Sequence, residues 1–596
     1  MKRLKAVFAP RVVGVPPANP VRDLMLLPDG EIRHYGFRGD FQAGDVVPVY
    51  LSSFDHGFSW TEHEAPAFSP GATVRSPWSG DWLTVLACHG KPCLEEYQSI
   101  HANCPQPGLW LHRSMAGPDG PFVSKRVGDL LPRLLVPRQP VALKSRRRWI
   151  LPAHASATTG EVTRLQPVVY LSDDDADTWR LVCLPPIPRP ELQWPHAGLR
   201  WHNCGEEPSV AELADGRLHM LIRTAHDRYW ETFSSDAGET WSPAQPSRFY
   251  GTITTPLLFP LSDGRLLAVH NNTTPLPEVD HSRQPGLTDD ERNGIWEDVF
   301  TNRDAIHAAI SDDGGKTWSG FRELHLNERR NDGDFRSHGG NDVSMDKSVH
   351  QSQAVELPHG KVLLAFGQHP DCRRMIVFDP DWLLETGRRD DFRHGLGGWS
   401  VHSYLKSIAG CYRGFTGHCS ANRRPGPTLV PHPDGEPREV LRIARHPDDR
   451  LIEEKEGAVW NFPAAQSGRL EMRIRQPRGA AGAQISLVDR WFNPTDPVVA
   501  AFSQFVLKLD AEGRINGHPA LRPDQWHRVS VSWDLAQTPP ARFQVDDGDE
   551  TPLTQGTGTL NGISYLHLQS AAETVDPHGL LLEWVEKTEW EFAHKA

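Results

Sequence analysis

Short apolar runs alternate with polar turn phrases along the first two thirds of the chain. The phrase at Leu213–Leu218, LADGRL, has the apolar runs PSVAEL and HMLIRT on its two sides. An Asp-Gly pair between two such runs is typical of a tight β-hairpin. The same phrase or a variant of it occurs at Leu27–Ile32, Leu261–Leu266 and Leu357–Val362, and in weaker form at Ser79–Leu83 and Ser145–Ile150.

A second repeated element, eight residues long, follows a third apolar run in several of these units. Its pattern, Ser-x-Asp-x-Gly-x-Thr/Ser-Trp, occurs at Ser53–Trp60, Ser172–Trp179, Ser234–Trp241 and Ser311–Trp318, with Ala176 replacing the glycine once, and Ser114–Phe122 is a degenerate copy. Such repetition indicates a repeat architecture. Six units, at about 20–70, 71–135, 136–195, 200–250, 251–345 and 346–385, predict an all-β, six-bladed β-propeller of four-stranded sheets.

Turn chemistry explains the eight-residue boxes without any ligand. The glycine permits a positive φ, and the aspartate side chain can accept hydrogen bonds from turn amides. The tryptophan adds a large apolar plug between neighbouring sheets. We therefore interpret the boxes as part of the scaffold rather than as binding sites.

The pattern changes near Arg388. The remaining segment has no boxes, and in WHRVSVSWD, Trp526–Asp534, apolar and polar residues alternate as expected of a half-buried strand. The phrase resembles strands of jelly-roll-type β-sandwiches, so we predict a propeller over 1–387 and such a sandwich over 388–596.

Bulk composition excludes several classes of function. The 596-residue chain has a net charge of −13 and no long basic run, so nucleic acid is not an expected partner. No stretch approaches the roughly 18 apolar residues of a membrane span. The eight cysteines are not regularly spaced, which argues against a disulfide framework. We expect a cytoplasmic protein with no membrane partner; the oligomeric state is not readable from the sequence.

Residues that follow the second strand of each predicted blade, and residues that begin the first strand, should meet at one mouth on the propeller axis. Together they form a polar set rich in histidine, consisting of Arg38, His89, His154, Glu206, Glu207, Arg223, His270, His350, Gln351 and His369. Two long insertions, Thr273–Asn302 and Arg329–Val349, precede strands on the same side, and the second carries His338. We expect both insertions to form walls or lids of the site.

The boxes resemble the Asp-boxes, or BNR repeats, of the sialidase superfamily, whose six-bladed propellers carry the active site on the rim opposite these turns. In GEEPSVAELADGRLHMLIRT, Glu207 and Arg223 match a glutamate that the family uses to activate a tyrosine nucleophile and an arginine that holds the substrate carboxylate. Asp40 occupies the loop of the family's acid/base aspartate. The C-terminal phrase resembles strands of concanavalin- or laminin-G-like sandwiches, which often bind sugar.

The rest of the sialidase pattern is missing. The tyrosine would begin the sixth blade, where the chain has His350 and Gln351, and no tyrosine occurs between Tyr250 and Tyr404. The resemblance therefore implies a carbohydrate-active enzyme that works without this nucleophile. The expected substrate is an oligosaccharide or glycoconjugate, and an acidic one.

Three functions are compatible with these residues. The first is hydrolysis of a terminal glycosidic bond in a carboxylate-bearing oligosaccharide, with Glu207 and Asp40 as paired carboxylates. The second is β-elimination on a uronate, in which Arg223 or Arg38 neutralises the carboxylate and a histidine, such as His350 or His270, or a bound metal stabilises the enolate. The third is glycan binding without catalysis. No cofactor is required; a divalent metal at the histidine-rich mouth is the alternative.

Overall fold

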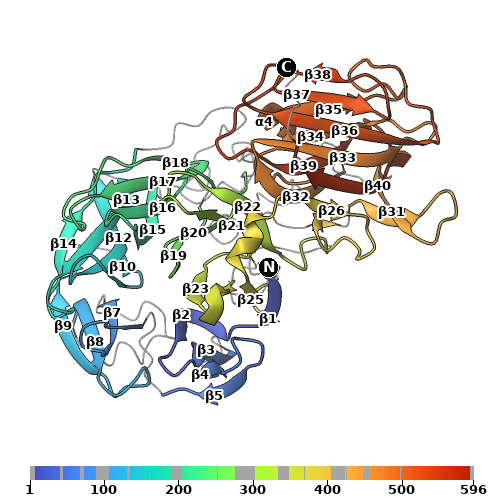
Figure 1. The fold of residues 1–596 in the computed structure, drawn as a ribbon. Coiled ribbons are helices and arrows are strands. Elements are labelled where there is room, and N and C mark those ends of the chain that lie inside the picture. Colours follow the sequence, from blue (N-terminus) through green and yellow to red (C-terminus); the bar gives the residue numbers. More distant parts are fainter. Residues whose placement is uncertain are drawn as a thin grey trace, which may run out of the picture.

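The computed structural model describes residues 7–590, except for 41–44, 67–72, 89–105, 130–134, 160–161, 189–203, 252, 275–302, 333–347, 368, 405–422, 425, 447–455 and 497. These residues form two β-structures, a ring of small sheets and a sandwich beside it (Figure 1). The predicted all-β class, with a six-bladed propeller followed by a β-sandwich, is confirmed. Within the described residues, no helix has the length and apolar character that crossing a membrane requires.

Each of the first three blades is an antiparallel sheet whose strands follow chain order. Blade 1 comprises β2 (Ala18–Leu26), β3 (Ile32–Asp40), β4 (Asp45–Ser53) and β5 (Thr61–Glu64). Blade 2 comprises β6 (Val74–Arg75), β7 (Trp82–Cys88), β8 (Gly108–Ser114) and β9 (Val123–Gly128). Blade 3 comprises β10 (Leu135–Pro137), β12 (Trp149–Thr159), β13 (Val162–Ser172) and β14 (Arg180–Cys183), and the short β11 (Val141–Ala142) also pairs with β12.

Blades 4 and 5 repeat this order, whereas blade 6 does not. Blade 4 comprises β15 (Cys204–Glu212), β16 (Leu218–Thr224), β17 (Arg228–Ser234) and β18 (Gln245–Tyr250). Blade 5 comprises β19 (Leu257–Pro260), β20 (Leu266–His270), β21 (Ala305–Ser311) and β22 (Ser319–Leu326). Blade 6 comprises β23 (Gln353–Glu356), β24 (Val362–Phe366), β25 (Arg374–Phe378) and a strand from the N-terminus, β1 (Arg11–Gly14).

The N-terminal strand closes the ring. β1 runs antiparallel to β25, with Arg11 opposite Val377, so the first and last parts of the propeller share one sheet. Phe8 and Val13 pack against the apolar core between blades 6 and 1. Sequence reasoning assigned the sixth blade to 346–385 alone, because the local pattern of residues 11–14 carries no sign of its distant partner.

The four boxes share one hydrogen-bond pattern. In the box at Ser234–Trp241, Asp236 accepts from the backbone N–H of Thr240 at 2.9 Å and from its hydroxyl at 2.5 Å, while the Trp241 indole donates to the Gly238 carbonyl at 3.1 Å. The other three boxes make the equivalent contacts. The fifth residue of every box has a positive φ, including Ala176 at 75°.

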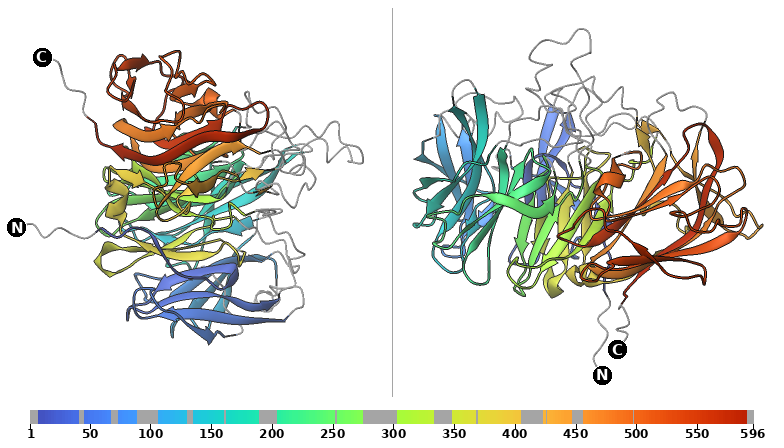
Figure 2. Two further views of the ribbon diagram at one scale, coloured as in Figure 1. Left: turned by 90° about the vertical axis from the view of Figure 1, so that its right-hand side faces the viewer. Right: turned by 90° about the horizontal axis from the view of Figure 1, so that it is seen from above.

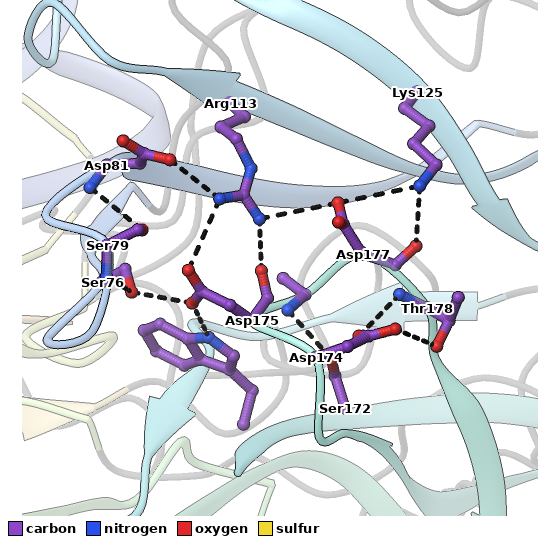
Figure 3. A network of polar contacts seen from close by, with 12 residues as sticks. Ser76, Ser79, Asp81, Arg113, Lys125, Ser172, Asp174, Asp175, Asp177 and Thr178 are labelled. Atoms are coloured by element: carbon purple, nitrogen blue, oxygen red, sulfur yellow. Dashed lines mark hydrogen bonds and ion pairs between the residues drawn. The ribbon is translucent and has the colours of Figure 1, made fainter. Parts of the chain in front are cut away.

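The box at Ser172–Trp179 also joins two blades (Figure 3). Asp175 accepts from the Ser76 hydroxyl at 2.7 Å and from the Trp149 indole at 3.0 Å, which connects blade 3 to the hairpin of blade 2. Arg113 of blade 2 reaches Asp81 at 2.8 Å and donates to the Asp175 carbonyl. The box aspartate itself, Asp174, is engaged within its own turn.

The C-terminal domain is a sandwich of two antiparallel sheets. The larger sheet has the order β30 (Thr428–Pro431), β31 (Glu439–Arg445), β40 (Asp576–Thr588), β33 (Ser467–Arg475), β36 (Trp526–Asp534), β37 (Ala541–Val545) and β38 (Thr551–Leu553), with β26 (Arg388–Asp390) also on β40. The smaller has the order β27 (Trp399–Ser400), β32 (Gly457–Ala465), β39 (Ile563–Ser570), β34 (Ala483–Val488) and β35 (Phe505–Leu509). Trp399, Trp460 and Trp533 are fully buried in the core between them.

A few short elements complete the fold. The 3-10 helix η3 (Pro358–Gly360) forms the turn between β23 and β24, and η4 (Pro380–Leu384) follows the last propeller strand. In the sandwich, β28 (Ser403–Tyr404) pairs with β29 (Arg423–Arg424), and α4 (Val499–Phe502) is a single helical turn.

The sandwich packs against blade 5 (Figure 2). The Trp491 backbone N–H donates to the Asn272 carbonyl at 2.9 Å, and its carbonyl accepts from Thr274 N–H at 3.0 Å. The backbone N–H of Glu323, on the outer strand β22, donates to the side chain of Asn461 at 3.0 Å. Because backbone groups are paired across this contact, the two domains are joined by hydrogen bonds as well as by apolar packing.

A buried polar chain lies at this interface. Tyr565 of the sandwich donates to Glu323 at 2.7 Å, and its hydroxyl also contacts His307 of blade 5. Burial raises the pKa of Glu323 to about 7, although the Arg388 and Arg330 charges and the Tyr565 hydrogen bond oppose this change. The carboxyl group is therefore partly protonated at neutral pH.

Replacing the box glycines tests how much conformational strain a side chain introduces at the positive φ of these turns. Gly238 and Gly315 have φ of 90° and 82°. A Cβ on Gly315 would meet its nearest neighbour, His219 Nδ1, at 3.6 Å, whereas one on Gly238 would lie 2.9 Å from Ile150 Cδ1. We expect Gly315→Ala to cost about 1 kcal/mol through φ alone and Gly238→Ala to cost about 1–3 kcal/mol more through overpacking. Thermal unfolding of both variants measures the difference; equal losses would contradict this account.

Glu323→Gln tests the pH dependence of the interface. The carboxyl group of wild type titrates near 4.5 when unfolded and near 7 when folded, so its contribution is complete below pH 4.5 and is lost as pH rises through 7. The neutral amide of Glu323→Gln does not titrate. The free energy of unfolding of the variant should therefore rise by about 1–3 kcal/mol relative to that of the wild type over this pH window. Denaturant unfolding at several pH values measures it.

Glu328→Gln is the matched control, because Glu328 lies in the same segment and its hydrogen bond to Arg374 lowers its pKa. The control should not gain stability over wild type as pH rises. A constant difference between Glu323→Gln and wild type from pH 4.5 to 8 would show that Glu323 does not titrate as described.

Candidate functional site

Two carboxylates and an arginine form the centre of the candidate site at the beginning of blade 4. Glu206 and Glu207 lie in β15, where the strand register shifts before Ser209 and Glu207 has a φ of 41°. In a regular strand, consecutive side chains point to opposite faces. The irregularity instead allows both to reach Arg223, whose Nε lies 3.0 Å from Glu206 and whose Nη1 lies 2.6 Å from Glu207.

Donors from three further blades converge on Glu207. Gln351, just before the first strand of blade 6, donates its amide to the two carboxylate oxygens at 3.1 and 3.4 Å. The Thr255 hydroxyl, from the corresponding place in blade 5, donates to Oε2, and Arg138 of blade 3 approaches Oε1 at 3.4 Å. Hydrogen bonds to a carboxylate favour its ionised form. The site therefore holds a fixed anion that is surrounded by donors.

His154 completes this group from blade 3. Its Nδ1 accepts the backbone N–H of Glu207 at 3.1 Å, so the proton of the neutral ring is on Nε2. Burial lowers the pKa of His154 to about 4, and the charges of Arg138 and Arg223 act in the same direction while Glu207 opposes them. His154 is thus a neutral, positioning imidazole near neutral pH and a weak base.

The structure brings together Glu206, Glu207, Arg223, His154 and Gln351, as the propeller geometry predicted. His350 lies next to them but is turned into the protein, with 3% exposure. Buried Arg303 donates to its Nε2 at 2.9 Å. A guanidinium at this nitrogen opposes its protonation, so the geometry does not favour His350 as a base at Nε2.

Three predicted mouth residues are placed elsewhere. His270 is 1% exposed and packs against Phe249 and Phe321, and burial lowers its pKa to about 3. The expectation that it lines the mouth is wrong, because the end of β20 is enclosed by blade 4 and the sandwich interface.

Arg38 and His369 also differ from the prediction. Arg38 is exposed and forms ion pairs with Glu62 and Glu64 of the outermost strand β5, so its side chain is directed away from the axis. His369 is buried in the β24–β25 turn, where its carbonyl accepts from Cys372 and Arg373. In both cases local contacts decide where the side chain lies, and the position of a residue at the end of a strand does not reveal those contacts.

Some predicted site residues fall outside the part of the chain that the structure describes. These are His89, His338, most of the two insertions and the side chain of Asp40 at the end of β3. Their assigned roles stay predictions.

Sequence reasoning missed Arg138, Thr255 and Arg303. Thr255 lies just before the first strand of blade 5, as Gln351 does in blade 6, so the repeat could have pointed to it. Arg138 and Arg303 had no such signal, because they lie between repeat elements.

Metal ligands do not gather around Glu207 in the part of the chain that the structure describes. There, a group of three side chains close enough to share an ion is formed by His432, Glu436 and Glu583 in the sandwich. Arg438 and Arg473 both form ion pairs with Glu583. Two guanidinium groups already balance this carboxylate, so the donor set does not suit a divalent cation.

Comparisons with known proteins gave a match to a family model and several similar solved structures. Residues 126–364 match the family model of the BNR repeat-like domain. The comparison with curated proteins gave no match. Similar solved structures include a protein of unknown function from Dyadobacter fermentans, with 16% identity over 62% of this chain and 99% of that chain and a TM-score of 0.39.

Two sialidases are also similar. Trypanosoma rangeli sialidase in complex with sialic acid has 14% identity over 98% of this chain and 92% of its own, with a TM-score of 0.34. A mutant of NanB sialidase from Streptococcus pneumoniae has 12% identity over 63% and 71%, with a TM-score of 0.38. The match to the BNR repeat-like model lies within the first domain, whose six four-stranded sheets form a β-propeller.

Proposed function

We propose that this protein is a glycoside hydrolase that cleaves a terminal glycosidic bond in a carboxylate-bearing oligosaccharide at the mouth of the propeller. The observation that supports this most directly is the Glu207 carboxylate, on which side chains from blades 3, 4, 5 and 6 converge. Such preorganised groups, assembled from distant segments, are characteristic of catalytic sites.

The hydrogen bonds of Glu207 decide which role it can take. Arg223, Thr255 and Gln351 all donate to it, so the carboxylate stays ionised and is suited to act as a base or nucleophile rather than as an acid. The proton for the leaving group must then come from another residue. Asp40, at the end of β3, is the candidate that the sequence offers.

Gln351 explains how the reaction would differ from that of a sialidase with a tyrosine nucleophile. Its amide donates to Glu207 from the position where the resemblance expects the tyrosine. An amide is not a nucleophile, so Glu207 would act directly on the sugar or on a water molecule.

Arg138 and Arg223 are the proposed receptors of the substrate carboxylate. A guanidinium matches a carboxylate with two parallel hydrogen bonds. Glu206 and Glu207 fix Arg223 from two sides, whereas Arg138, whose Nη1 lies 3.4 Å from Glu207 Oε1, is more loosely held. We therefore propose that Arg223 orients the substrate carboxylate and that Arg138 adjusts its position to contact it.

Glycan binding without catalysis is the second candidate. It is favoured by the saturation of the Glu207 carboxylate, both oxygens of which accept hydrogen bonds from protein donors. The uronate lyase alternative has less support, because His154 is a weak base and Nε2 of His350 is occupied by Arg303.

Incubation of the purified protein with acidic oligosaccharides separates these functions. New reducing ends without ultraviolet absorbance of an unsaturated uronate indicate hydrolysis. Absorbance of that chromophore would instead establish the lyase. Saturable binding with neither product would establish a recognition protein and overturn the proposed hydrolase.

Glu207→Gln tests the assignment of the base or nucleophile. The amide retains the shape but lacks the charge, and we expect kcat/KM to fall by about 100-fold or more. Glu212→Gln, at the opposite end of β15, is the matched control, because Glu212 only accepts the backbone N–H groups of Lys144 and Ser145. Full turnover by Glu207→Gln would remove Glu207 from the mechanism.

Gln351→Met tests whether the amide tunes Glu207. Loss of this donor removes stabilisation of the ionised carboxylate, so the acidic limb of the pH–rate profile should move to higher pH, with kcat lowered by about tenfold. Gln351→Glu would add a second carboxylate there and should lower the rate further through repulsion. If Gln351→Met keeps the wild-type pH profile, Gln351 serves packing only.

A further inference from the structure

A cavity of about 450 Å³ lies at the junction of propeller and sandwich and shares no lining residue with the Glu207 site. Its walls come from the outer strand of blade 5, the connection between the domains, the β32–β33 turn and the end of β40. The lining residues are Ser319, Gly320, Leu383, Leu384, Glu385, Thr386, Pro463, Ala464, Ala465, Ser467, Lys587, Glu589 and Trp590. Its volume is in the range of small-molecule sites.

Lys587 is the most unusual group in this lining. It is 2% exposed, and its Nζ donates to the Thr386 carbonyl at 2.5 Å. An ammonium group has three N–H donors, and no described residue accepts from the other two. A buried ammonium that lacks an anionic partner is costly, so an acceptor supplied from the cavity would stabilise it.

Trp590 offers a second unfilled donor. Its indole Nε1 is buried and has no hydrogen-bond acceptor among the described residues. Arg469 stacks on the ring with its guanidinium carbon 4.8 Å from the centroid, which adds positive charge near this wall. Both unfilled donors of the cavity therefore favour a ligand that accepts hydrogen bonds.

The acidic lining residues do not cancel this preference. Glu385 forms an ion pair with buried Arg322 at 3.0 Å, so its charge is already balanced, and Glu589 is exposed. The apolar part of the wall is formed by Leu383, Leu384 and Pro463–Ala465. Leu384, which is 49% exposed, adds apolar surface to this wall.

We propose that this cavity binds a small organic acid, with its carboxylate on the Lys587 ammonium and the Trp590 N–H and its hydrocarbon part on Leu384 and Pro463–Ala465. This site is separate from the proposed catalytic function and does not depend on it. Since the walls belong to both domains, the bound acid stabilises the contact between propeller and sandwich, and the unfolding temperature rises as the free acid exceeds its dissociation constant.

Benzoate and its neutral isostere benzamide are the probes that test the charge requirement. We expect benzoate to bind in calorimetry and to raise the unfolding temperature, with benzamide at least about tenfold weaker. Lys587→Met conserves volume and removes the charge, and it should lose benzoate binding by about tenfold or more. The control, Lys508→Met, changes an exposed lysine on β35 and should bind as wild type does.

The pH dependence of wild type provides a test that needs no variant. Burial lowers the pKa of Lys587 to about 8, Arg322 acts in the same direction, and Glu589 opposes them. Glu385 and Arg469 are further charged groups near this amine. Benzoate affinity should therefore fall as pH rises from about 7 to 9. Binding that is independent of pH, equal for benzoate and benzamide, or unchanged in Lys587→Met would overturn the proposal.

Trp590→Phe separates the indole donor from its apolar ring. This variant should bind benzoate a few-fold less tightly and keep the preference over benzamide. Turnover of any oligosaccharide substrate should be the same with and without benzoate. Loss of catalysis in Glu207→Gln together with retained benzoate binding would show that the two sites function independently.

Discussion

Closure of the ring is the constraint on which the site depends. Each blade presents its first strand to the axis, and only a closed set of six brings the starts of those strands to one place. The closing contact is four residues long, Arg11–Gly14 against β25. It joins the first described segment to the last blade, so the positions of Thr255, Gln351 and Glu207 are fixed relative to one another.

The charge arrangement around Glu207 is a second consequence of this geometry. Two carboxylates and two arginines share a small region, and each carboxylate is held by a guanidinium rather than by solvent. Water is replaced by fixed dipoles and charges, which cost no reorganisation when a substrate arrives. The same arrangement separates roles: Glu207 remains an anion, and His154 remains neutral because burial and the nearby arginines disfavour its charged form.

The sandwich changes the character of blade 5. Segments that would reach solvent in an isolated propeller are here paired with Trp491 or enclosed with Tyr565. His270 and His307 consequently lie in an aromatic, buried setting, and Glu323 holds its proton to near neutral pH. The junction also forms a cavity with unfilled hydrogen-bond donors, so the C-terminal domain contributes walls of a second candidate binding site as well as covering blade 5.

The sequence by itself determined the all-β class, six repeats, the hairpins, the boxes and the meeting of Glu207 with Arg223. These depend on local periodicity and on short spacings within one blade, which are written in consecutive residues. Only the tertiary structure decided that Arg11–Gly14 closes blade 6, that Arg38 pairs with β5, and that His270 is buried. Those outcomes arise from contacts between segments far apart in the chain, and no local pattern specifies which partner a strand edge, a guanidinium or an imidazole will meet.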